Sequence, residues 1–66
     1  MMKVKIFAAR ETNPHHAANE VSRQIEDWQN DGTIVQSVQT QTVYDDDNRC
    51  TIIATVLFEE LVPARP

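Results

Sequence analysis

The chain has 66 residues, ten acidic and six basic side chains, a formal net charge of −4 and a single cysteine. Its length predicts one small domain, and one cysteine rules out an internal disulfide or a zinc site built from four thiolates. The acidic balance argues against a general affinity for DNA or RNA. The lack of a long apolar run argues against a membrane span, and the lone cysteine favours a cytoplasmic protein.

The first predicted element is a strand at residues 3–9, where the sequence KVKIFAA alternates along its length. A period of two with β-branched residues is typical of a strand. The alternation predicts two faces, with Lys3, Lys5 and Phe7 on one and Val4, Ile6 and Ala8 on the other.

Clear start and stop signals predict a helix near residues 14–30. Asn13 suits the N-cap, because its side-chain oxygen can accept a hydrogen bond from a free backbone N–H, and Pro14 suits the first helical position. Gly32 is expected to end the helix with a left-handed cap. Four apolar residues at spacings of three, four and three form one stripe on this helix, which Ala17 widens: Ala18, Val21, Ile25 and Trp28.

Two further strands are predicted at residues 33–44 and 50–61, joined by the polar sequence DDDN at residues 45–48. Asp and Asn favour turns, so DDDN is interpreted as a hairpin tip. In the second strand, Ile34 and Val38 are expected to share a face. The third strand is apolar on both sides, which is typical of a strand covered on both faces and therefore central in its sheet. Its faces carry Ile52, Ala54, Val56 and Phe58 on one side and Ile53, Leu57 and Leu61 on the other.

These elements predict an α+β fold, a single split β-α-β-β domain over residues 1–61 with an extended tail at residues 62–66. The hairpin makes the last two strands antiparallel, and the strand–helix–strand unit favours parallel outer strands joined by a right-handed crossover. The expected sheet is therefore antiparallel with order 1-3-2 and one helix on one face. The helix stripe is expected to pack on the sheet with Val4, Ile6, Val38 and Val56.

One helix cannot cover both faces of a three-stranded sheet, so one apolar face is predicted to lack a partner within the chain. Exposed apolar patches of this kind usually mark an interface. We therefore expect a homodimer formed by face-to-face sheet packing, with edge pairing of strands as an additional contact. Coverage of this face by the tail or the loops is the alternative. The expected interface residues are Phe7, Ile53, Leu57 and Leu61.

The sequence offers only weak candidates for metal binding or catalysis. His16 and Glu20 lie one helical turn apart, a spacing found in zinc sites, but no further ligand is near them in sequence. The aspartates at residues 45–47 lack the glycine and the distal glutamate of a calcium-binding loop. Cys50 follows Arg49, yet both histidines are distant in sequence. No enzyme activity, cofactor or metal site is therefore predicted.

Three features together resemble a known family: the N-terminal KVKIF, the acidic amphipathic helix ending in WQN, and the final apolar strand TIIATVLFEE. They are similar to the small sporulation proteins of spore-forming bacilli and their non-sporulating relatives. Those proteins are equally short, begin with a K-V-K-like strand and end in an aliphatic strand closed by glutamate. The resemblance covers most of the chain and implies a shared fold, and it carries no catalytic residue over to this sequence.

The leading functional prediction is a small, non-enzymatic, cytoplasmic homo-oligomer that acts as an interaction module or accessory protein. One alternative is an acidic binder of a basic protein partner, antitoxin-like or a nucleic-acid mimic, because ten acidic residues on a compact body can occupy a basic surface. A second alternative is a small-ligand or metal-binding protein that uses His16, Glu20 or the aspartates.

Overall fold

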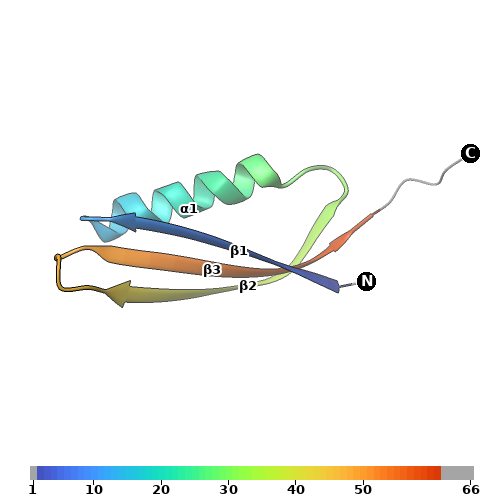
Figure 1. Cartoon of the computed structure of the whole chain (residues 1–66). Helices are drawn as coiled ribbons and strands as arrows, with labels where there is room; N and C mark the ends of the chain where they lie inside the picture. Colours follow the sequence, from blue (N-terminus) through green and yellow to red (C-terminus); the bar gives the residue numbers. More distant parts are fainter. Residues whose placement is uncertain (1, 62–66) are drawn as a thin grey trace, which may run out of the picture.

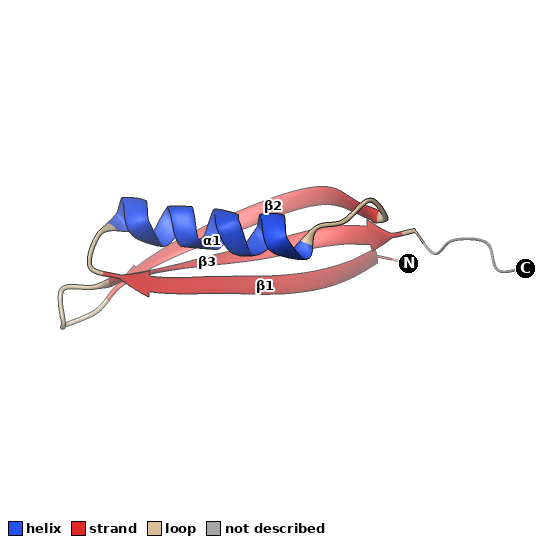
Figure 2. Cartoon of the chain, turned by 90° about the horizontal axis from the view of Figure 1, so that it is seen from above, coloured by secondary structure: helices blue, strands red, loops and turns tan. Residues whose placement is uncertain are grey.

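A computed structural model describes residues 2–61 as three strands and one helix (Figure 1). In chain order these are β1 (Met2–Glu11), α1 (Pro14–Trp28), β2 (Thr33–Tyr44) and β3 (Cys50–Glu60). The strands form an antiparallel sheet in the order β1-β3-β2, and α1 lies across one face of it (Figure 2). The predicted α+β fold with sheet order 1-3-2 is confirmed. The predicted tail at residues 62–66 lies outside the described residues.

The helix begins where the sequence predicted and ends earlier than expected. Asn13 is the N-cap, and its side-chain oxygen accepts a hydrogen bond of 2.8 Å from the backbone N–H of His15. The helix stops at Trp28, and the C-cap Gln29 is extended, so the predicted left-handed cap at Gly32 is wrong. The glycine serves a close approach instead, because a Cβ atom at Gly32 would lie 3.0 Å from the backbone oxygen of Leu61.

The DDDN sequence forms the tip of the β2–β3 hairpin. Asn48 has a φ of 63°, and its N–H donates to the carbonyl oxygen of Asp45 over 3.3 Å. The N–H of Asp45 donates in turn to the carbonyl oxygen of Arg49 over 3.0 Å. A tight turn followed by one residue in the left-handed region is the usual three-residue hairpin loop, and asparagine tolerates that region better than most side chains.

The hydrophobic core lies between α1 and the two strands β1 and β3. At the C-terminal end of α1 the half-buried ring of Trp28 packs against this core and makes edge-to-face contacts with Phe7, at a centroid distance of 5.4 Å, and with Phe58, at 4.6 Å. Such pairs contribute about 0.5–1.5 kcal/mol beyond the area that they bury. The other buried members are small or β-branched residues: Ala9, Val21, Ala54 and Val56.

The predicted orientation of β1 is wrong. Phe7 is directly opposite Ala54 and is buried under the helix, whereas Val4 and Ile6 lie on the other face of the sheet and are 59% and 62% exposed. The space above Ala54 accommodates a large side chain, and the Phe7 ring fills it against Trp28. Phe7 is therefore a core residue and not an interface residue.

Two smaller packing predictions also change. Ala17 is fully buried against the sheet while Ala18 is exposed, so the apolar stripe of α1 is rotated by one residue at its first turn. A β-bulge between Val35 and Ser37 shifts the alternation of β2. Because of the bulge, Val38 shares a face with Val35 and not with Ile34. Val38 is on the helix side as predicted, but it lies beyond the edge of the helix and is 47% exposed.

Candidate interaction surface

The face of the sheet opposite α1 is uncovered within the described residues. Residues directly opposite one another in an antiparallel ladder point to the same side, so the strand register defines this surface. We call it the open face. From β1 it takes Met2, Val4, Ile6, Ala8 and Arg10; from β3 it takes Thr51, Ile53, Thr55, Leu57 and Glu59; from β2 it takes Ile34, Ser37, Gln39, Gln41 and Val43.

The open face is apolar along β1 and β3 and more polar along β2. Ile53 and Leu57, which were predicted to lie at an interface, are on this face and are half-buried between neighbouring strands. Val4 and Ile6 are next to them on β1 and are more exposed. Leu61, the fourth predicted residue, follows the last residue of β3, and its side chain is 58% exposed.

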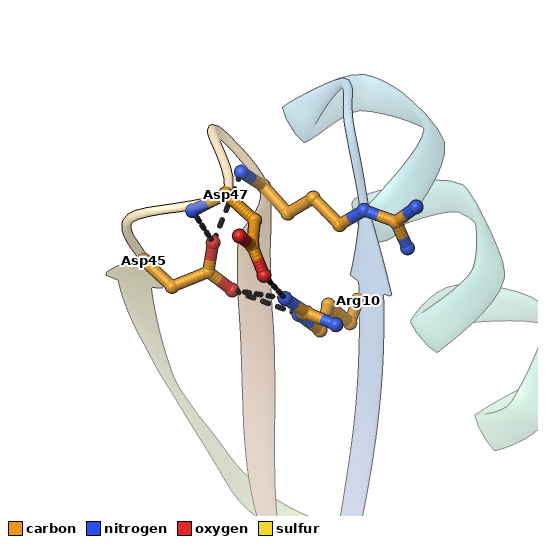
Figure 3. A network of polar contacts seen from close by, with 4 residues as sticks. Arg10, Asp45 and Asp47 are labelled. Carbon is orange, nitrogen blue, oxygen red and sulfur yellow. Dashed lines mark hydrogen bonds and ion pairs between the residues drawn. The ribbon is translucent and has the colours of Figure 1, made fainter.

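A cluster of charged side chains lies at the hairpin end of the open face. The guanidinium of Arg10 donates from Nε to Asp45 Oδ2 over 2.8 Å and from Nη2 to Asp47 Oδ2 over 3.1 Å (Figure 3). The other carboxylate oxygen of Asp45 accepts from the backbone N–H groups of Asp47 and Arg49. The carboxylates of Asp45 and Asp47 are therefore engaged by Arg10, and that of Asp45 also by its own turn.

The same contacts shift the ionisation of these groups. The Arg10 hydrogen bond holds the pKa of Asp45 below its ordinary value, and backbone hydrogen bonds from Arg49 and Asp47 act in the same direction. The pKa of Arg10 is raised by the same ion pair. Both side chains are open to water, so the pair fixes the position of the hairpin tip more than it stabilises the fold.

His16 and Glu20, the weak candidates for a metal site, stand on the exposed side of α1. The Glu20 carboxylate accepts from Arg23 Nε over 3.2 Å and also pairs with its terminal nitrogen. This hydrogen bond lowers the pKa of Glu20 below its ordinary value. Within residues 2–61 no three His, Cys, Asp or Glu side chains gather closely enough to hold a metal ion.

The remaining candidate, Cys50, is the first residue of β3 and is 1% exposed. It faces the helix side of the sheet, directly opposite Glu11 on β1 and Tyr44 on β2. Both histidines lie in the first turn of α1 and are exposed, whereas Cys50 is buried. The described residues enclose no pocket, and no helix among them has the length and apolarity to cross a membrane.

Sequence reasoning did not assign Val4, Ile6, Ala8 or Arg10 to this surface. Val4 and Ile6 were assigned to the helix side, although the alternation of β1 separated them correctly from Phe7. A preference for burying the one aromatic ring of the strand could have corrected the choice. No local sequence pattern indicated the position of Arg10, because its partners Asp45 and Asp47 are distant in sequence.

Comparison of the chain with protein-family models, with curated proteins and with solved structures finds no match. The resemblance to the small sporulation proteins therefore stays a prediction.

Proposed function

We propose that the protein is a small, non-enzymatic, cytoplasmic interaction or accessory protein that works as a homo-oligomer. The observation that carries the proposal is the open face, whose apolar centre holds Val4, Ile6, Ile53 and Leu57. A domain of this size buries only about 60% of the surface that its unfolded chain exposes, so covering this face adds needed stability. A second copy of the chain is the occupant that we propose.

The dimensions of the open face suit a self-association of modest strength. β3 has 11 residues. With a rise of about 3.3 Å per residue and strands about 4.8 Å apart, the face measures about 36 by 14 Å, or about 500 Å². Two such faces packed together bury about 1,000 Å² in total, which is below the range of about 1,200–2,000 Å² for stable interfaces and matches a weak contact.

The charge distribution favours this proposal over an acidic surface that binds a basic protein. Asp45 and Asp47 are paired with Arg10, and Glu20 is paired with Arg23, so part of the acidic charge is neutralised within the chain. The charged residues of the open face, Arg10 and Glu59, stand near its two ends and leave the apolar centre free. Covering that centre does not remove a charged group from water, so it carries no penalty for burying an ion.

The proposal is tested by analytical ultracentrifugation over a wide range of protein concentrations. We expect wild-type chains to associate and the Leu57→Asp variant to associate at least about tenfold more weakly, because each face would bury an unpaired carboxylate. Asn19→Asp is the matched control. It adds the same charge at an exposed position on α1, and it should leave the association constant unchanged.

Two results would contradict the proposal. A wild-type mass equal to one chain at every concentration rules out the homo-oligomer. An association that Leu57→Asp leaves intact places the contact somewhere other than the open face. Circular dichroism of both variants establishes that any change in mass is not caused by unfolding.

A further inference from the structure

The outer edge of β2 is a second surface without a partner among the described residues. β2 is the edge strand of the sheet on one side, and α1 packs on β1 and β3 and leaves most of β2 uncovered (Figure 2). Val38 and Tyr44, on the helix side of this strand, are 47% and 69% exposed. No residue from Thr33 to Tyr44 is charged, and none is proline or glycine.

The edge of β1 is different. It carries several charged side chains, which discourage another strand from pairing there. In addition, Gln24 of α1 donates from Nε2 to the carbonyl oxygen of Ala8 over 3.2 Å, so part of that backbone already has a partner. The charged residues of β1 are Lys3, Lys5, Arg10 and Glu11. One edge of the sheet is therefore protected, and the other is not.

The hydrogen bonds at the two ends of the β2–β3 pair show which backbone groups of β2 face outward. Asp45 donates its N–H to Arg49 at the hairpin, and Leu61 donates its N–H to Gly32 at the other end. In an antiparallel ladder, hydrogen-bonded pairs alternate with non-hydrogen-bonded pairs. Counting alternate residues inward from Asp45 and from Gly32, with one extra residue at the bulge, gives the same assignment for Ser37–Tyr44. The residues whose N–H and C=O groups point away from β3 are Val38, Thr40, Thr42 and Tyr44.

We propose that this edge pairs, antiparallel, with the β2 edge of a second copy of the chain. The regular segment from Ser37 to Tyr44 can pair with the same segment of the second copy, related by a two-fold axis at Gln41. In this arrangement every outward N–H and C=O group of the segment has a partner. In this register Thr40 is opposite Thr42 of the second copy, and Val38 is opposite its Tyr44. Threonine pairs and aromatic–β-branched pairs are among the favourable cross-strand neighbours. This self-complementarity supports a second copy of the chain as the occupant.

The edge contact goes beyond the proposed packing of open faces, and either contact can fail without the other. A two-fold axis perpendicular to the sheet places both helices on one side and joins the two open faces on the other. The joined face then measures about 1,000 Å², twice that of one chain by the strand dimensions used above. Packing two such pairs buries about 2,000 Å² in total, which is within the range of stable assemblies. The expected assembly has four chains.

Amide hydrogen exchange measured by NMR tests the edge contact residue by residue. In a chain whose β2 edge is free, the N–H groups of Val38, Thr40 and Thr42 exchange rapidly, while those of Gln39 and Gln41 are held by β3. We expect the outward set to exchange at least about tenfold more slowly than in an unpaired edge, and to lose that protection on dilution. Rapid exchange of the outward set at concentrations where the chains associate would overturn the proposal.

Charge substitutions at two positions test the register. The double variant Thr40→Lys with Thr42→Lys places like charges opposite each other twice across the two-fold axis. The matched variant Thr40→Lys with Thr42→Glu places opposite charges there. We expect the first to weaken edge pairing at least about tenfold and the second to retain it, because directly opposed like charges destabilise a strand pair. Equal behaviour of the two variants would overturn the register.

The same variants in the Leu57→Asp background separate the two contacts. With the open face disabled, we expect a two-chain species that persists with the Lys/Glu pair and dissociates with the Lys/Lys pair. A two-chain species that is insensitive to both charge pairs would overturn the edge contact, as would protection of the outward amides only on addition of another polypeptide. A monomer in this background, with a wild type that still associates, would also overturn it.

Discussion

The position of Phe7 gives the sharpest test of the structure. Its side chain is 7% exposed, and its ring packs over Ala54 and against Trp28. Replacing a buried phenylalanine with alanine usually costs about 3–5 kcal/mol, and the small side chain of Ala54 can do little to fill the cavity. We expect a loss of about 4 kcal/mol for Phe7→Ala. A domain of 66 residues has a total stability of about 3–10 kcal/mol, so this variant loses between about 40% and all of that stability.

The milder variant Phe7→Leu keeps the test quantitative. We expect it to lower the free energy of unfolding by about 1–2 kcal/mol in urea titrations followed by the fluorescence of Trp28. Ile6→Ala is the matched control on the opposite face. Ile6 is 62% exposed, so its truncation should cost less than about 1 kcal/mol in a single chain, and its effect should depend on protein concentration. The reverse ranking of Phe7→Leu and Ile6→Ala would refute the assignment of the two faces.

Three further outcomes follow from local contacts. Asn13→Ala should lower the free energy of unfolding by about 1 kcal/mol, because the N-cap hydrogen bond is lost; an unchanged urea midpoint would contradict this. Asn48→Ala should cost about 1 kcal/mol at the positive φ, whereas Asn48→Gly should change the urea midpoint little. The pKa of Asp45 is lowered in the folded chain, so its contribution to stability is present above its ordinary pKa and is lost as the pH falls below about 4. Arg10→Gln should raise the Asp45 pKa in an NMR titration, and an unchanged value would show that the ion pair is not its cause.

The sequence predicted the order of the elements because the decisive signals are local. The N-cap and proline defined the start of α1, and the two-sided apolar pattern of β3 placed that strand in the centre of the sheet. The face of β1 that meets the helix could not be predicted in the same way, since both faces carry apolar side chains. That choice depends on the β1–β3 register and on the room above Ala54, which are long-range properties. The bulge of β2 has no marker either, because no glycine stands at Gln36.

The β3 part of the candidate interaction surface was predicted from the sequence, and the β1 part was not. Ile53 and Leu57 followed from the excess of apolar residues on β3, because a strand that is apolar on both faces needs cover on both. The β1 part was wrong because Phe7 was assigned to the open face, and Val4 and Ile6 were assigned to the helix side. A period of two separates the faces of a strand but does not say which of them a helix will cover, and a shift by one residue reverses the answer.

The strand order has a consequence for the synthesis of the chain. β1 is made first, yet its neighbour in the sheet is β3, with Met2 opposite Glu59. Until the ribosome has released Cys50–Glu60, β1 has no hydrogen-bonding partner among the described strands, and α1 has only half of its packing surface. Every β1–β3 pair joins residues that are distant in sequence, a pattern that slows folding. The native sheet therefore forms only once β3 is available to pair, and until then Trp28 lacks its contact with Phe58.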